Sequence, residues 1–289
     1  MQDFIFISGT MLYGFENRAA GVIFTVKFLI TMILAAALVQ MDIVWGDKDV
    51  NIEWAVRAVE NAAGADLVVL PEMFATGFMA EDVSAAEAMD GRVVTAMRVA
   101  AAKTGRAVAG SVIIDPADGG LPANRFVFVR PDGGIEWYDK RHLFSFSGED
   151  RYYTRGKRRR VIEYRGIRIL PQVCYDLRFP VWSRNRNDYD AAIYVASWPE
   201  SRVYAWDTLL RARAIENQCY VLGVNRVGND STAAYNGHSC AVDFYGRTIG
   251  GLADGAIGTI YAELDTEALA SYRAKFRAWC DADDFDLSV

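Results

Sequence analysis

Three residues of this chain have side chains that together could carry out acyl transfer: Cys174, Glu72 and Lys140. Each comes directly after an apolar, strand-like segment, and these segments are 169–173, 66–71 and 135–139. In sheets flanked by helices, binding and catalytic groups gather just beyond the carboxyl ends of strands, so we expect the three side chains to share one pocket. A thiol, a base and a fixed cation in one pocket indicate a hydrolase.

The expected chemistry follows from the properties of a thiol. An unperturbed cysteine has a pKa of about 8.5 and is only a few per cent thiolate at neutral pH, so attack requires a carboxylate that accepts its proton. Glu72 is the candidate base, and it can return this proton to a leaving nitrogen. Preorganised donors to the developing oxyanion are worth about 10²- to 10³-fold each in rate, and the candidates are Lys140 and the backbone N–H of Tyr175. The sequence therefore predicts ping-pong kinetics through a thioester.

The motifs around these residues resemble the nitrilase, or carbon-nitrogen hydrolase, superfamily, and within it the bacterial omega-amidase branch. The resemblance runs from about Met32 to Phe285. Four strings in the family's order carry it: Leu-Pro-Glu-Met-Phe at 70–74, Tyr-Asp-Lys-Arg-His-Leu-Phe at 138–144, Val-Cys-Tyr-Asp-Leu-Arg-Phe-Pro at 173–180 and Arg-Ala-Ile-Glu-Asn-Gln at 213–218. Any one of these strings would be weak evidence, but four in order are strong evidence.

The resemblance implies a role for each residue. Glu72 is the general base, Lys140 rather than Arg141 is the cation beside the oxyanion, and Cys174 is the nucleophile. Glu149, nine positions after Lys140, corresponds to the family's second glutamate. The resemblance also implies a homodimer or a higher homo-oligomer.

The remaining cysteines, Cys219, Cys240 and Cys280, are expected to be small buried hydrophobic residues. The four cysteines contain no C-x-x-C pair, and two histidines are too few for a His-rich metal site. We therefore predict no metal and no cofactor. A working thiol favours the reducing cytoplasm as the location of the protein.

The composition is that of a mildly acidic protein with a large core. The chain has 289 residues, 52% hydrophobic content, and Lys+Arg 31 against Asp+Glu 37, which fits one domain. Its one basic run, 155–160, lacks interleaved aromatic residues and precedes the strand-like 161–164, so we interpret it as a solvated turn. We predict a small-molecule amide as partner and no nucleic acid.

Strand-like and helical segments alternate along the chain, which indicates the α/β class. Helices are predicted from Pro180 onward and over 50–63, 92–104, 203–217 and 266–276. Strands are predicted over 34–41, 66–70, 107–114, 125–129, 135–138, 161–164, 167–173, 191–196, 220–224, 239–244 and 257–264. This mixture of βα units and hairpins predicts two sheets with outer helices, and the resemblance implies the four-layer α-β-β-α sandwich of the nitrilase type.

The start of the chain does not fit the rest. Residues 1–31 fall outside the resemblance, and the apolar stretch 21–40 is long enough to raise a membrane helix or a signal peptide. Both readings conflict with the predicted core strand at 34–41. We therefore expect no membrane attachment, and we expect that translation begins at Met32 or that residues 1–31 are a dispensable extension of a carbon-nitrogen hydrolase domain at 32–289.

Three functions are compatible with the sequence. The first is an omega-amidase that hydrolyses the terminal amide of a 2-oxo dicarboxylic acid monoamide, such as 2-oxoglutaramate or 2-oxosuccinamate. Its anionic substrate needs a donor, and Arg202 and Tyr204 are candidates, whereas Arg178 is expected to hold a nearby carboxylate in a structural role. The second is another carbon-nitrogen hydrolase, namely an N-carbamoyl amino acid hydrolase, a nitrilase or a deaminated glutathione amidase. The third is a catalytically silent binding subunit, against which the intact Glu72, Lys140 and Cys174 argue.

Overall fold

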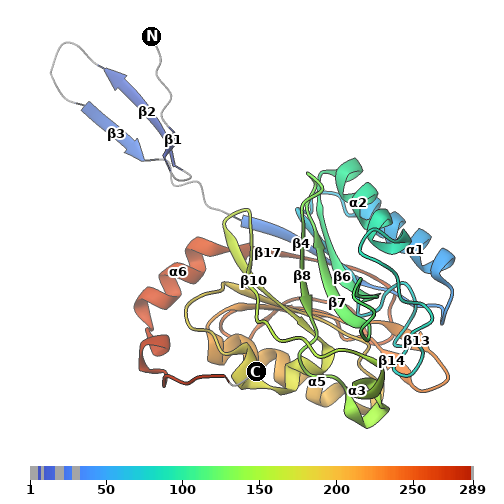
Figure 1. Ribbon diagram of the computed structural model, residues 1–289. Coiled ribbons are helices and arrows are strands. Elements are labelled where there is room, and N and C mark those ends of the chain that lie inside the picture. The colour runs from blue at the N-terminus through green and yellow to red at the C-terminus, as the bar shows by residue number, and fades with distance from the viewer. Residues whose placement is uncertain (1–5, 8–9, 17–22, 28–32, 288–289) are drawn as a thin grey trace. The chain divides into compact units, whose positions relative to one another are not determined.

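The computed structural model describes residues 6–7, 10–16, 23–27 and 33–287 (Figure 1). The chain divides into two compact units, 1–32 and 33–289, which are described separately. In the first unit, three short antiparallel strands form a sheet in the order β1-β2-β3, with bounds Phe6–Ile7, Thr10–Glu16 and Ile23–Lys27.

The second unit contains two six-stranded sheets, each with a parallel centre and antiparallel edges. The first sheet has the order β17(Gly258–Asp265)-β4(Ile33–Gln40)-β5(Leu67–Val69)-β6(Ala107–Ile114)-β7(Ala123–Val129)-β8(Ile135–Asp139). The second has the order β16(Thr248–Gly251)-β15(Cys240–Val242)-β12(Tyr220–Val224)-β11(Ala191–Val195)-β10(Ile167–Val173)-β9(Ile162–Tyr164).

Alternation along the strands sorts apolar side chains into three cores. On β4, Leu34, Ala36 and Leu38 join Ile169 and Val173 of β10 in the core between the two sheets. Ala37 and Val39 of β4 pack with helices α1 (Lys48–Asn61) and α2 (Arg92–Thr104) on the outer face of the first sheet. Helix α5 (Val203–Asn217) packs on the outer face of the second sheet. Because strand side chains alternate between faces, these three cores define the predicted four-layer α-β-β-α sandwich, which is confirmed.

The remaining elements connect these layers. They are the helices α3 (Glu149–Tyr152), α4 (Pro180–Ser183) and α6 (Thr266–Lys275), the hairpin β13 (Val227–Asn229) and β14 (Ala234–Asn236), and the 3-10 helices η1 (Ser145–Ser147), η2 (Cys174–Arg178), η3 (Glu200–Arg202) and η4 (Ala278–Asp281).

Most predicted elements are confirmed, five of them to the residue: 92–104, 107–114, 167–173, 203–217 and 220–224. The helix predicted from Pro180 is a single turn, because Arg184 at its C-terminus has extended backbone angles. The strand predicted over 239–244 shortens to 240–242, where its pairing with β16 is irregular. The hairpin β13-β14 and strand β16 lie in segments with glycine, asparagine or threonine, and their short runs gave no periodic signal.

The apolar stretch 21–40 is not one continuous helix. Its described part contains two strands, β3 and β4, whereas 28–32 lie outside the described residues, as do parts of the proposed extension 1–31. Strand β4 pairs along its whole length with β17 and also with β5. Within the described residues, no helix has the length and apolar character needed to cross a membrane.

A chain that begins at Met32 should fold and melt like the full chain. Both six-stranded sheets lie within 33–289, so the truncation removes no strand from either of them. We expect unchanged Tm and unchanged specific activity for amide hydrolysis. The measurement is sensitive, because a loss of about 1 kcal/mol would lower Tm by about 2–4 °C in a protein of this size. A clearly lower Tm or aggregation would assign residues 1–31 a part in the fold.

Candidate active site

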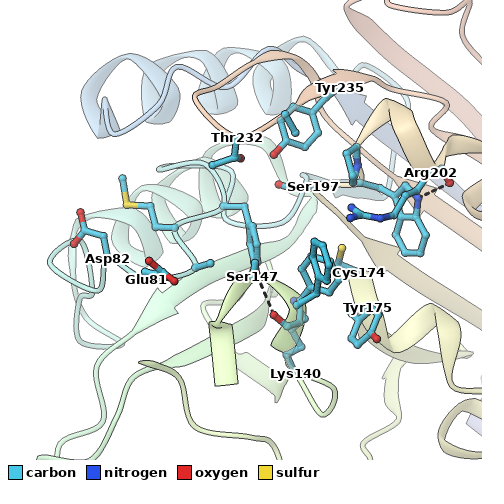
Figure 2. Close-up of a pocket in the computed structure, with 18 of the residues that line it drawn as sticks. Glu81, Asp82, Lys140, Ser147, Cys174, Tyr175, Ser197, Arg202, Thr232 and Tyr235 are labelled. Carbon is cyan, nitrogen blue, oxygen red and sulfur yellow. Dashed lines mark hydrogen bonds between the residues drawn. The ribbon is translucent and has the colours of Figure 1, made fainter. Parts of the chain in front are cut away.

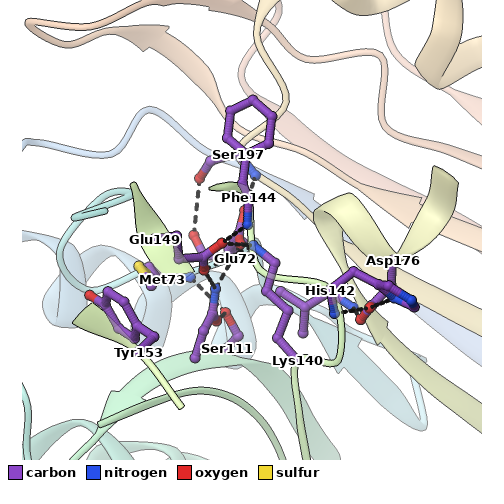
Figure 3. Close-up of polar contacts among 12 residues, drawn as sticks. Glu72, Met73, Ser111, Lys140, His142, Phe144, Glu149, Tyr153, Asp176 and Ser197 are labelled. Atoms are coloured by element: carbon purple, nitrogen blue, oxygen red, sulfur yellow. Dashed lines mark hydrogen bonds and ion pairs between the residues drawn. The ribbon is translucent and has the colours of Figure 1, made fainter. Parts of the chain in front are cut away.

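The ends of three strands bring Glu72, Lys140 and Cys174 to one place (Figures 2 and 3). Glu72 is the third residue after β5, Lys140 follows β8 directly, and Cys174 follows β10 directly. Cys174 has a φ of 44°, in the left-handed region that a non-glycine residue enters at a cost of about 1–3 kcal/mol. This sharp turn directs its side chain into the cavity between the strand ends.

Lys140 is the centre of the polar contacts and is 1% exposed. Its Nζ donates to Glu72 Oε1 at 2.9 Å, to Glu149 Oε1 at 3.0 Å and to Glu149 Oε2 at 2.9 Å. An ammonium group has three N–H bonds, so these contacts use all of them. Burial alone would lower the pKa of Lys140, but the charges of Glu149 and Glu72 outweigh it and raise that pKa. The lysine therefore stays cationic.

Glu72 is fully buried and held at both carboxylate oxygens. Its Oε1 accepts from Lys140 and, at 2.8 Å, from Asn124 Nδ2. Its Oε2 accepts from the backbone N–H of Ser197 at 2.9 Å, just beyond β11 (Figure 3). These donors fix the orientation of the carboxylate, whose negative charge contributes to the raised pKa of the Cys174 thiol.

Glu149 is the first residue of α3 and is also fully buried. Besides Lys140, it accepts from Asn124 Nδ2 at 3.1 Å and from the backbone N–H of Phe144 at 2.6 Å. Its pKa is raised, first by burial and then by the charge of Glu72, although Lys140 opposes the shift. The second glutamate predicted from the resemblance thus lies within hydrogen-bond distance of Lys140.

The thiol of Cys174 is held in its neutral form. Burial raises its pKa well above the ordinary value, the negative charge of Glu72 adds to the effect, and Lys140 opposes it. A thiol in such surroundings does not ionise by itself at neutral pH. The arrangement permits attack on a carbonyl carbon only when the proton passes to a base as the bond forms.

Asp176 fixes the turn that carries Cys174 (Figure 3). Its buried carboxylate accepts from the backbone N–H of Val173 at 3.0 Å and from that of His142 at 2.9 Å. The hydroxyl of Tyr138 donates to it at 2.8 Å, and Nδ1 of His142 lies 2.8 Å away. Because Val173 belongs to the second sheet and Tyr138 to the first, this carboxylate joins the Cys174 turn to the segment that holds Lys140.

The cavity at these strand ends has a volume of about 540 Å³. Aromatic side chains form much of its wall: Trp45, Phe78, Phe144, Phe146, Tyr175, Trp198 and Tyr235. Figure 2 shows Cys174 and Arg202 toward one end of the cavity and the rim residues Glu81 and Asp82 toward the other. The cavity is therefore apolar along its wall and carries opposite charges at its two ends.

Of the two candidate substrate-binding residues, one lines the cavity and the other does not. Arg202 lines the cavity and lies over the rings of Phe144 and Phe146, at 5.3 and 5.4 Å from their centroids. Tyr204 does not line it, and its side chain is 83% exposed, because the helix α5 turns it outward one residue after its start.

Arg178 differs from its predicted structural role. We expected it to hold a nearby carboxylate, but among the described residues no ion pair joins it to one. It lines the cavity instead and lies over the ring of Trp198 at 4.9 Å from the centroid.

Sequence reasoning missed four polar residues of the site: Asn124, Ser111, Ser197 and Asp176. All four are at most 5% exposed, and all lie in or beside segments that the sequence predicted as strands. The only available signal was a polar residue in an otherwise apolar strand, as at Ser111 in 107–114. A buried polar side chain needs a partner, but the sequence does not say which one.

The structure agrees only in part with the burial predicted for the other cysteines and with the exposure predicted for the basic run 155–160. Cys219 is buried as expected, whereas Cys240 is half-buried and Cys280 is exposed at the end of the chain. The basic run is mostly exposed, although Arg159 forms an ion pair with Asp188. In the part of the chain that the structure describes, no group of three or more metal-ligating side chains is arranged to hold an ion.

Replacing Asp176 by Asn should lower both stability and turnover. An amide presents one acceptor oxygen and an NH2 group, so at least one of the backbone N–H groups of Val173 and His142 loses its acceptor. An unsatisfied buried donor costs about 1–3 kcal/mol in the free energy of unfolding. Urea unfolding and ammonia release would measure the two effects. The matched control is Asp188→Asn at a half-buried carboxylate, for which we expect a loss below about 1 kcal/mol and normal turnover; equal effects of the two variants would contradict this role of Asp176.

Comparison with known proteins agrees with this geometry. Residues 35–274 match the family model described as carbon-nitrogen hydrolase. The chain is 47% identical over 257 residues to "Omega-amidase YafV" of Yersinia enterocolitica, covering 88% of this chain and 98% of that protein. It is 32% identical over 249 residues to the "2-oxoglutaramate amidase" of Bacillus subtilis, covering 84% and 95%.

Among solved structures, XC1258 of Xanthomonas campestris, described as a CN-hydrolase superfamily protein with an arsenic adduct in the active site, is 42% identical with a TM-score of 0.85. The alignment covers 89% of this chain and 99% of that one. The resemblance drawn from four short strings is therefore confirmed over nearly the whole of the described domain, and this chain belongs to the carbon-nitrogen hydrolase family.

Proposed function

We propose that this protein is an omega-amidase, which hydrolyses the terminal amide of a 2-oxo dicarboxylic acid monoamide to the 2-oxo acid and ammonia. The observation that carries the proposal is a single cavity lined by the thiol of Cys174, the ammonium group of Lys140 and two arginines, with the buried carboxylate of Glu72 paired to Lys140. Support also comes from relatives named omega-amidase that align with nearly their whole length. The candidate substrates 2-oxoglutaramate and 2-oxosuccinamate are small anions, which such a cavity can bind.

Acylation uses Cys174 as nucleophile and Glu72 as general base. Sγ attacks the amide carbon while the thiol proton passes to Glu72, so a C–S bond forms and negative charge moves to the carbonyl oxygen. Collapse of this intermediate breaks the C–N bond, and Glu72 delivers the proton to the leaving nitrogen, which departs as ammonia. The raised pKa of Cys174 fits this coupled transfer, since burial disfavours a free thiolate before substrate binds.

The oxyanion is stabilised by the positive charge of Lys140, whose N–H bonds are directed at the two glutamates, and by a hydrogen bond from the backbone N–H of Tyr175. The N–H of Tyr175 belongs to the first residues of η2, where backbone donors have no acceptor within the helix. Glu149 keeps the ammonium group of Lys140 in place through two of its three N–H bonds. Such donors cost no reorganisation as the charge develops, which is the origin of their effect on rate.

Deacylation reverses these roles. A water molecule enters the position that ammonia has left, and Glu72 takes one of its protons as the oxygen attacks the thioester carbon. The C–S bond breaks, the proton returns to Sγ, and the free acid leaves. Every atom of the two steps is accounted for by amide, water and the chain's own groups.

The substrate carboxylate is bound by Arg178 and Arg202. Both line the cavity, and in the described residues neither has a carboxylate partner. Stacking on aromatic rings limits the motion of the two guanidinium groups, so less entropy is lost when they bind an anion. Tyr204 has no part in this site because its side chain lies in solvent.

We further propose that the protein works as a homodimer or higher homo-oligomer in the cytoplasm. The oligomer follows from the family resemblance, and the reducing compartment suits a chain with four free cysteines and a nucleophilic thiol.

Cys174→Ala and Cys174→Ser should abolish ammonia release while leaving Tm unchanged. Serine fails because its hydroxyl is far less acidic than a thiol.

Iodoacetamide should label Cys174 stoichiometrically with parallel loss of turnover, and Cys219→Ala serves as the matched control that keeps activity. More than a tenth of wild-type activity in a clean Cys174→Ala preparation would contradict the mechanism, and full labelling without loss of turnover would favour a binding subunit.

Among candidate amides, 2-oxosuccinamate should give a higher kcat/KM than succinamate, propionamide, N-carbamoyl-β-alanine or a simple nitrile. Arg178→Gln and Arg202→Gln should each lower kcat/KM for 2-oxosuccinamate by about 10- to 100-fold, because a hydrogen bond to a charged group is worth about 1.5–3 kcal/mol. Neither should change kcat/KM for propionamide, which has no carboxylate. The surface control Arg211→Gln should leave all rates unchanged. If the carbamoyl compound or the nitrile is the best substrate, the omega-amidase proposal fails.

A further inference from the structure

Asn124 occupies a position between the two glutamates of the site. It lies on β7, is fully buried, and its Nδ2 donates to Glu72 Oε1 at 2.8 Å and to Glu149 Oε1 at 3.1 Å. Both N–H bonds of one amide group are thus directed at carboxylates. Among neutral side chains, only an amide offers two donors on one atom, so no hydroxyl could replace it.

The orientation of this amide is set by Ser111 on β6. The hydroxyl of Ser111 donates to Asn124 Oδ1 at 2.8 Å. It accepts from the backbone N–H of Met73 at 2.9 Å (Figure 3). Since the N–H of Met73 can only donate, the Ser111 proton points to Asn124, and the oxygen of the amide must face Ser111. The chain of hydrogen bonds begins beside Glu72 in the backbone and ends on its carboxylate.

The charges around Asn124 explain what such a donor can do. Two buried carboxyl groups and one ammonium group share this site, so one negative charge would be uncompensated if both carboxyl groups were ionised. A like charge nearby disfavours the ionised form of a carboxylate, and hydrogen bonds donated to that form favour it. Asn124 supplies such bonds to both carboxylates without adding charge. Four segments contribute the titratable groups around the Asn124 amide. These groups are Glu72, Lys140, Cys174, and the pair Glu149 and Tyr153.

We propose that Asn124, oriented by Ser111, is a positioning residue that holds the Glu72 carboxylate in the orientation in which it accepts the Cys174 proton. The proposal rests on the proposed function of Glu72 as the general base. It predicts that the Asn124 amide controls the pH at which the site becomes competent, beyond any contribution to folding.

The test is the pH dependence of Cys174 alkylation by iodoacetamide in the full-length protein, followed by mass spectrometry of the Cys174 peptide. This readout requires the base but no substrate, so it does not depend on which amide the enzyme hydrolyses. Asn124→Asp replaces the NH2 group by an oxygen of the same size and adds a third carboxylate. In the plot of alkylation rate against pH, the acid limb is the region in which the rate rises with pH. For Asn124→Asp this limb should move to higher pH by about one unit, so that alkylation on the acid side is about tenfold slower than in the wild type.

Two further variants control this result. Ser111→Ala frees the amide to rotate and should move the acid limb in the same direction by less. If Asn124→Asp does not fold, Ser111→Ala decides the matter. The matched control is Asn185→Asp, a buried amide whose Nδ2 donates to the backbone carbonyls of Tyr189 and Asn217, and it should lower Tm without moving the limb.

The Glu72→Gln variant separates the two ways of failing. If Glu72→Gln retains the acid limb of the wild-type alkylation profile, Glu72 is not the base. Both the proposed role of Glu72 and this proposal for Asn124 are then wrong. If it abolishes the limb while folded Asn124→Asp and Ser111→Ala keep the wild-type one, Asn124 has only a structural role and the proposed function stands. A shift in Asn124→Asp or Ser111→Ala, with none in Asn185→Asp, supports the proposal.

Discussion

The buried ammonium group of Lys140 is the interaction on which the site depends. Two carboxylates with no solvent exposure would repel each other strongly, and Lys140 lies within 3.0 Å of both. Removing one member of a buried ion pair is strongly destabilising, because the partner charge is then left uncompensated in a medium of low dielectric constant. The strand ends that carry these residues are therefore held together by the charges needed for the chemistry.

The two sheets are also joined beside Lys140 by hydrogen bonds between backbone N–H groups and buried carboxylates. Ser197, beyond β11 of the second sheet, donates its backbone N–H to Glu72 of the first. Asp176, in the turn after β10, accepts from the segment after β8. Each contact crosses between the sheets, so the relative position of base and nucleophile is determined by the packing of the sandwich. This is a more rigid support than a loop could give, and catalytic geometry tolerates only small errors.

The cavity combines hydrophobic walls with a few charged groups. Aromatic rings form much of the wall around Cys174, and such an apolar wall strengthens the electrostatic interactions inside the site. The two arginines lie over such rings and remain available to an anion. A small anionic amide can thus be oriented by its carboxylate while its other end meets the thiol, which is the requirement of the proposed omega-amidase reaction.

The amino-acid sequence alone predicted the family, the alternation of strands and helices, and the strand ends at which chemistry could occur. These are local properties: apolar periodicity marks β10 and α5 to the residue, and the strings around Glu72, Lys140 and Cys174 are contiguous. Tertiary structure decided which polar residues complete the site. Asn124 and Asp176 have partners that lie 52 and 34 residues away in the chain, at Glu72 and His142, and no spacing rule connects them. The same reason explains the two arginines: Arg202 and Arg178 face the cavity because the turns after β11 and β10 converge there, whereas Tyr204, two residues beyond Arg202, is turned into solvent by the start of α5.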